Sequence, residues 1–111
     1  MNKSPSPYLS HMRDSAQEVL TYASSHSFEE FAGNDWDQAA AIRNLEIIGE
    51  AATNISKEFR REHPQIPWLD IIDFRNVAIH QYMEVDIQIV WDVIQNDIPF
   101  LLKQLNNLLD K

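Results

Sequence analysis

Apolar residues recur along most of this chain at intervals of three and four positions, which is the spacing of one face of an α-helix. Ser6 followed by Pro7 is a favourable helix start, because the N–H that proline lacks would have no partner at the first helical position. The apolar positions that follow at this spacing are Leu9, Met12, Ala16, Val19, Leu20 and Ala23. No stretch alternates apolar and polar residues as a half-buried strand does. The pattern predicts an all-α protein whose first helix ends near His26.

The middle of the chain predicts two further helices. Ser27 and Glu30 have the spacing of a capping box, in which the two side chains satisfy free backbone N–H groups, so we expect a short helix directly after Ser27. Asn34 or Asp35 is then expected to cap a long helix that runs to about Arg61. The apolar stripe of this helix is formed by Leu45, Ile48, Ala52, Ile55 and Phe59.

The C-terminal half predicts two more helices. Pro67 is expected to start one that ends around Met83, and Asp86 is expected to cap another that continues to about Leu108. Pro99 lies inside this last helix and should kink it, because proline cannot donate a backbone hydrogen bond. Four substantial helices with short connections favour an up-and-down bundle of four to five helices.

Length and composition agree with a single domain. A chain of 111 residues suffices for one core, so we expect one domain over residues 1–111 with a flexible tail at 1–6. No apolar run approaches the roughly 20 residues of a membrane span, and the N-terminus lacks a secretory signal. We therefore expect a cytoplasmic protein with no membrane partner. The absence of cysteine excludes disulfides, cysteine zinc sites and thiol nucleophiles.

The formal net charge of −8 bears on the partners of the chain. Broad, nonspecific nucleic-acid binders usually carry a basic face that displaces counterions, and this charge weighs against that class. RNA binding would require the basic residues to converge locally, or two subunits to pool theirs. Acidity would also suit a protein that docks a basic partner. The net charge leaves these alternatives open.

The segment richest in chemistry runs from Arg75 to Tyr82. Arginine is a permanent cation that can bridge phosphate oxygens, and histidine can both give and take a proton near neutral pH. On a regular helix Arg75 and His80 are about 140° apart in projection, whereas Asn76 lies one turn before His80 and could fix its tautomer. Arg75 and Tyr82 would border the same groove.

A symmetric dimer could turn this segment into a complete active site. RNA cleavage without a metal requires a base for the 2′-hydroxyl proton, an acid for the leaving oxygen and positive charge near the phosphorane. One chain offers a single motif histidine, whereas two copies that pack around a two-fold axis offer two histidines and two arginines. The alternative is structural: Arg75 in a salt bridge, His80 as a cap or half buried, and Tyr82 at the edge of the core.

Other candidate sites have structural alternatives that we prefer. Glu58, Glu62 and His63 could suggest a metal site, but His63 lies at a proline-bounded helix exit, so we expect solvated surface and no metal. Tryptophans can stack on bases, but the three of this chain lie on or beside apolar stripes, which favours core packing. They are Trp36, Trp68 and Trp91.

Landmarks along nearly the whole chain resemble the HepT-like toxins of the HEPN superfamily, whose motif is arginine, four residues, histidine, one residue and tyrosine. They include Tyr8-Leu9 with His11, the segment 44–51, His63-Pro64, Ile66-Pro67-Trp68, Arg75 to Tyr82, Val85-Asp86, Val90-Trp91 and Asp97-Ile98-Pro99. Linked motifs at these separations are far more specific than the eight residues of the motif alone.

The resemblance implies a HEPN-like homodimer that acts as a ribonuclease without metal or other cofactor, the toxin of a toxin–antitoxin pair. Such toxins pair with a nucleotidyltransferase antitoxin that transfers AMP to the motif tyrosine. Carried over, Arg75 and His80 are catalytic and Tyr82 is modified; from helical spacing, Asn76 supports His80. The added AMP would bring bulk and negative charge into a groove that must accept RNA phosphate.

The chain departs from the family pattern directly before the motif. The family often has glycine-methionine there, whereas this chain has Asp73-Phe74. A carboxylate at this position could repel substrate or pair with Arg75. Together with the net charge, it keeps open a second hypothesis: a non-catalytic HEPN module that binds nucleotide or assists a partner nucleotidyltransferase.

Overall fold

The computed structural model describes residues 4–80 and 86–110, with the side chains of residues 75–80 outside the description. Within these ranges the chain is helical and contains no strand, so the predicted all-α, HEPN-like bundle is confirmed. The first helix, α1, spans Ser6–Ser24 and has Pro7 in its first turn, as expected. Ser6 of the predicted 1–6 tail already lies in α1. No helix of the described part is long and apolar enough to cross a membrane.

The predicted capping box forms at the start of α2, Phe28–Ala32. The Ser27 hydroxyl accepts the Glu30 backbone N–H at 3.1 Å, and the Glu30 carboxylate accepts the Ser27 N–H at 2.9 Å. Asn34 in turn caps α3, Asp35–Thr53, because its side-chain oxygen accepts the Asp37 N–H. These local signals gave both helix starts correctly.

The expectation of one helix from Asp35 to about Arg61 is wrong. The helix α3 ends at Thr53, and a separate helix, α4, spans Lys57–Glu62. Short polar side chains cause the break, because they compete with the helical ladder for backbone groups. Thr53 and Asn54 both donate to the Glu50 carbonyl, at 2.6 and 3.0 Å. Ser56 then caps α4 by accepting the Phe59 N–H at 3.1 Å.

Helix α5 spans Trp68–His80 and follows Pro67, as predicted. Its expected end near Met83 lies outside the described residues. Asp86 caps α6, Ile87–Asp92, by accepting the Gln88 N–H at 2.9 Å. The chain then passes through a π-helical turn, η1, Val93–Asp97, into α7, Ile98–Leu109. This turn ends two residues before Pro99, and the kink expected at Pro99 stays a prediction.

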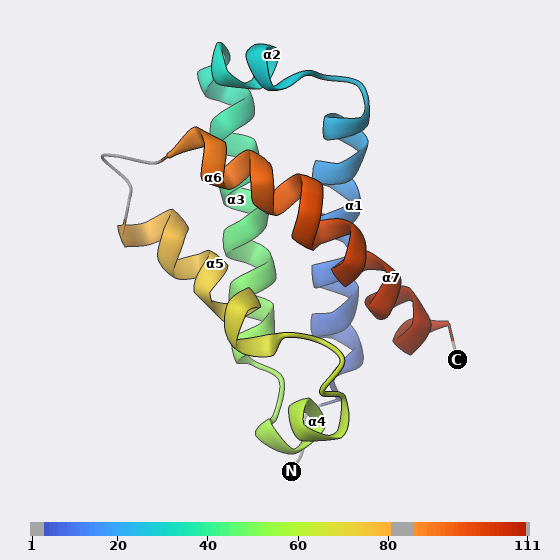
Figure 1. Ribbon diagram of the computed structural model, residues 1–111. Helices are drawn as coiled ribbons and strands as arrows, with labels where there is room; N and C mark the ends of the chain where they lie inside the picture. The colour runs from blue at the N-terminus through green and yellow to red at the C-terminus, as the bar shows by residue number, and fades with distance from the viewer. Residues whose placement is uncertain (1–3, 81–85, 111) are drawn as a thin grey trace.

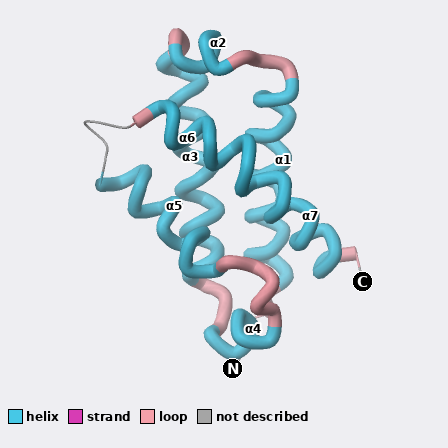
Figure 2. The backbone as a smooth tube through the Cα atoms, in the orientation of Figure 1, coloured by secondary structure: helices cyan, strands magenta, loops and turns pink. Residues whose placement is uncertain are grey.

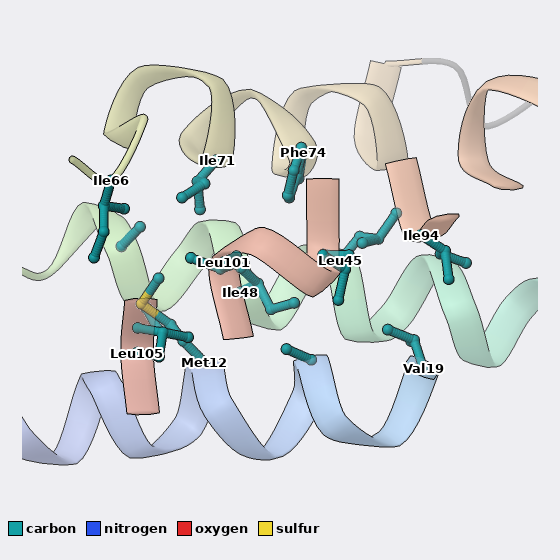
Figure 3. Close-up of a cluster of buried hydrophobic side chains, with 14 of the residues drawn as sticks. Met12, Val19, Leu45, Ile48, Ile66, Ile71, Phe74, Ile94, Leu101 and Leu105 are labelled. Carbon is teal, nitrogen blue, oxygen red and sulfur yellow. The ribbon is translucent and has the colours of Figure 1, made fainter. Parts of the chain in front are cut away.

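The principal helices alternate in direction, with α3 between α1 and α5 and with α7 against α1 (Figure 1). The loops lie at the ends of the helices (Figure 2). Figure 3 shows the shared core, to which α1 contributes Met12, α3 contributes Ile48 and α5 contributes Ile71 and Phe74. Because Ile71 and Phe74 are buried at 1% and 7% exposure, they fix the face of α5 that packs on α3. The core therefore holds the helix that carries the motif.

Candidate functional site

Three of the predicted site residues lie in the second half of α5. Arg75, Asn76 and His80 are helical, and His80 is the last residue of the element. Their side chains lie outside the described part of the structure, and Tyr82 lies outside the described residues altogether. One helix therefore carries the arginine, the asparagine and the histidine, as the spacing argument assumed. The groove shared by Arg75 and Tyr82, and the pairing of two copies, stay predictions.

The described side chains of α5 show which line of the helix faces outward. Leu69 is 75% exposed, and Asp73 is exposed one turn later. These two residues, one helical turn apart, mark the outward face of the described part of α5.

The Asp73-Phe74 pair that departs from the family pattern has two different environments. Phe74 is buried among the core residues that join α5 to the bundle (Figure 3). Asp73 lies on the exposed side. The departure therefore adds a core aromatic and a surface carboxylate directly before the motif.

A hollow of about 660 Å³ lies at the junction of α4 and the start of α5. Its lining combines basic and apolar side chains: Lys57, Arg60, Arg61, Pro64, Ile66, Pro67, Trp68, Leu69 and Asp70. The sequence interpretation missed this site. The available signal was charge clustering, since three of the nine lysines and arginines fall within residues 57–61.

A second hollow of about 400 Å³ lies where α5 meets η1 and α7. Asp70 and Asp97 both line it, together with Phe74 and Phe100. Burial, and then the nearby charge of Asp70, raise the pKa of Asp97 above its ordinary value. This hollow is acidic, so it does not favour phosphate.

A polar tie between α1 and α3 was also not anticipated. The Tyr22 hydroxyl donates to the Asp37 carboxylate at 2.6 Å, and the Tyr22 ring stacks on His26 with centroids 3.9 Å apart. Burial, this hydrogen bond and the charges of Asp37 and Glu30 raise the pKa of Tyr22 to about 12. Tyr22 is thus a neutral donor at physiological pH.

The prediction that the three tryptophans pack in the core is partly right. Trp68 and Trp91 pack in the core at 6% and 9% exposure, but Trp36 is 86% exposed, so core packing was wrong for Trp36. Within residues 4–80 and 86–110, no three His, Cys, Asp or Glu residues gather as metal ligands. The rings of His63 and Phe59 pack with their centroids 4.2 Å apart, and the His63 carbonyl accepts the Trp68 indole N–H.

The helical bundle and the arginine–X4–histidine spacing on α5 are those of a HEPN protein. The family model described as "Ribonuclease HepT-like" matches residues 12–108, and the chain belongs to this HepT-like family. It is 39% identical over 109 residues to "Putative RNase TTE0752" of Caldanaerobacter subterraneus subsp. tengcongensis, covering 98% of this chain and 97% of that protein. It is 36% identical over 108 residues to "Probable ribonuclease HepT" of Thermococcus cleftensis, covering 97% and 98%. No solved structure matches the chain.

Proposed function

We propose that this protein is a metal-independent endoribonuclease, the toxin of a toxin–antitoxin pair, and that it acts in the cytoplasm as a homodimer. The observation that carries the proposal is the family match over residues 12–108, which includes the whole segment from Arg75 to Tyr82. The related proteins named as ribonucleases extend over nearly the same length. The placement of Arg75 and His80 on one helix, α5, supports the assignment.

In the proposed reaction the two copies of His80 have opposite roles. One takes the proton of the RNA 2′-hydroxyl, and the freed oxygen attacks the adjacent phosphorus. His80 of the partner subunit gives a proton to the 5′-oxygen as its bond to phosphorus breaks. Arg75 stabilises the charge that builds up on the phosphorane oxygens, and Asn76 orients the His80 ring. The products are a 2′,3′-cyclic phosphate and a 5′-hydroxyl.

The proposed control step is the transfer of AMP to Tyr82 by a nucleotidyltransferase antitoxin. The Tyr82 oxygen attacks the α-phosphorus of ATP, pyrophosphate leaves, and the tyrosine becomes an adenylyl ester. The ester carries a negative charge and a nucleoside at the end of the motif. RNA phosphate would be repelled there, and cleavage would stop.

The direct test is the His80→Ala variant, assayed on RNA in the presence of EDTA. We expect wild-type protein to cleave RNA with the chelator present and the variant to lose at least about a hundredfold in kcat, the usual contribution of an acid–base residue. His11→Ala, at an exposed position of α1, is the matched control and should cleave normally. Unchanged cleavage by His80→Ala, with normal helicity, would refute the assignment.

A second candidate function is a non-catalytic HEPN module that binds nucleotide or assists a nucleotidyltransferase. The net charge of −8 and the exposed Asp73 next to the motif favour it. Under this alternative the purified protein binds the nucleotidyltransferase and cleaves no RNA. The cleavage assay therefore separates the two functions.

A further inference from the structure

The positive charge of this acidic chain is concentrated on one short helix. The chain has 17 acidic and 9 basic residues, yet Lys57, Arg60 and Arg61 occur within five positions on α4. All three line the hollow of about 660 Å³ beside the start of α5. This concentration is the local convergence of basic residues that the net charge required of an RNA-binding protein.

The three basic side chains have different tasks. The Arg60 guanidinium donates to the Ile55 carbonyl at 3.0 Å and to the Thr53 carbonyl at 3.4 Å, so it ties α4 to the end of α3. Lys57 and Arg61 are exposed and lie one helical turn apart. No described residue forms a hydrogen bond or ion pair with either of them. Their charges are therefore available to an anion in the hollow.

The rest of the lining is apolar except for Asp70, which adds one carboxylate beside the three basic residues. Pro64, Ile66 and Pro67 belong to the apolar part, and Leu69 leaves three quarters of its surface exposed there. The acidic residues of α4, Glu58 and Glu62, are not part of the lining. A cationic rim beside an apolar surface fits the phosphates and the flat bases of single-stranded nucleic acid.

The hollow also lies on the helix that carries the motif. It lies beside the first turn of α5, and His80 is the last residue of the same helix. The eleven residue steps from Leu69 to His80 correspond to about 17 Å along the helix axis. A stacked strand rises about 3.4 Å per nucleotide and covers this distance in about five nucleotides.

We propose that the hollow between α4 and the start of α5 docks the phosphate backbone of the RNA substrate, with Lys57 and Arg61 as its phosphate contacts, about five nucleotides from the cleaved bond. The proposal rests on the proposed function and adds a second RNA contact to the same reaction. Lys57 and Arg61 position the substrate and take no part in the chemistry.

The test is the Lys57→Gln/Arg61→Gln double variant, which keeps side-chain length and helix propensity. Steady-state cleavage is measured on a series of oligoribonucleotides extended stepwise on either side of one cleavage site. We expect KM to rise about tenfold on long substrates while kcat stays unchanged, and the plot of log KM against log salt to become shallower by about 1.4, the value for two single-strand phosphates. Substrates too short to reach the hollow should show wild-type KM.

The matched control is Arg13→Gln/Lys103→Gln, which removes the same charge from α1 and α7. Among residues 4–80 and 86–110, Arg13 pairs only with Asp110, at 3.4 Å on the surface, and Lys103 is exposed. This control should keep wild-type KM, so that a loss specific to α4 is not an effect of net charge. Circular dichroism should show unchanged helicity for both variants.

Separate outcomes address the inference and the function. Cleavage by wild type, with equal KM for the α4 variant at all lengths, overturns the docking site and leaves the nuclease standing. If wild type does not cleave, fluorescence anisotropy with labelled RNA decides: binding that the α4 variant loses supports the docking site without the nuclease, and no wild-type binding overturns both. Binding of polyglutamate is measured for the same proteins. If the α4 variant loses polyglutamate binding but keeps RNA binding, the hollow is assigned to an acidic peptide and the proposal is overturned.

Discussion

The attachment of α5 to the core determines where the motif lies, and Phe74 tests this attachment directly. Phe74 is 7% exposed, packs between α5 and the bundle, and immediately precedes Arg75. Truncating a buried phenylalanine to alanine costs about 3–5 kcal/mol, because apolar contacts are lost and a cavity is left. We take the lower end of this range, since Phe74 also borders the hollow shared with Phe100.

The expected change in melting temperature follows from the size of the chain. Unfolding entropy of about 2.1 cal/mol/K per residue gives about 0.23 kcal/mol/K for 111 residues. A loss of about 3 kcal/mol in Phe74→Ala therefore lowers Tm by about 13 °C, measured by the helical circular dichroism signal. Phe74→Met restores the residue type usual in the family and should cost less than about 1.5 kcal/mol.

Phe100→Ala is the matched control, because Phe100 is 47% exposed on α7. It should lose about 1 kcal/mol or less, which corresponds to about 4 °C. Equal losses in Phe74→Ala and Phe100→Ala would refute the view that Phe74 anchors the motif helix. RNA cleavage by Phe74→Met at wild-type rate would also show that the departure from the family pattern at this position is neutral.

Three smaller predictions concern the rest of the fold. Ser56→Ala removes the cap of α4 and should cost about 1 kcal/mol in denaturant unfolding, whereas Ser56→Asp should retain stability; equal losses would contradict the capping role. The pKa of Tyr22 is raised to about 12, so the contribution of Tyr22 to stability is full below about pH 10 and is lost as the pH rises through 12. In an absorbance titration at 295 nm, the tyrosine transition at the highest pH should disappear in Tyr22→Phe. Persistence of that transition in the variant would rule out this assignment. The pKa of Asp97 is raised, which means that the ionised carboxylate destabilises the fold. Asp97→Asn should therefore have a higher Tm than wild type at pH 7, and the two Tm values should converge in acid. A lower Tm for the variant at pH 7 would refute this.

Signals confined to a few neighbouring residues could be interpreted from sequence. Ser27, Asn34 and Asp86 each cap a helix start as predicted, because the donor and acceptor lie within three positions of one another. The break at Thr53–Ser56 was missed because Ile55 and Phe59 continue the apolar period through it. The Arg60 guanidinium helps to close that turn by donating to two backbone carbonyls. No spacing rule reveals these contacts.

The candidate site likewise has a part that follows from local sequence patterns and a part that depends on the fold. The sequence identified the segment and the helix that carries Arg75 and His80, since both follow from a local pattern. The basic hollow could not be predicted, because it exists only where α4 folds back beside the start of α5. The exposed Trp36 shows the same limit: an indole beside an apolar stripe is buried only if another element covers it.

Mixed dimers test most directly whether one active site draws His80 from both subunits. Wild-type protein is unfolded, mixed with increasing amounts of His80→Ala protein, refolded together and assayed for RNA cleavage at constant total concentration. If every site needs both histidines, only pure wild-type dimers are active, and activity follows the square of the wild-type fraction, falling to about one quarter at equal mixing. Activity that falls in direct proportion to the wild-type fraction, to about one half at equal mixing, would contradict the shared site.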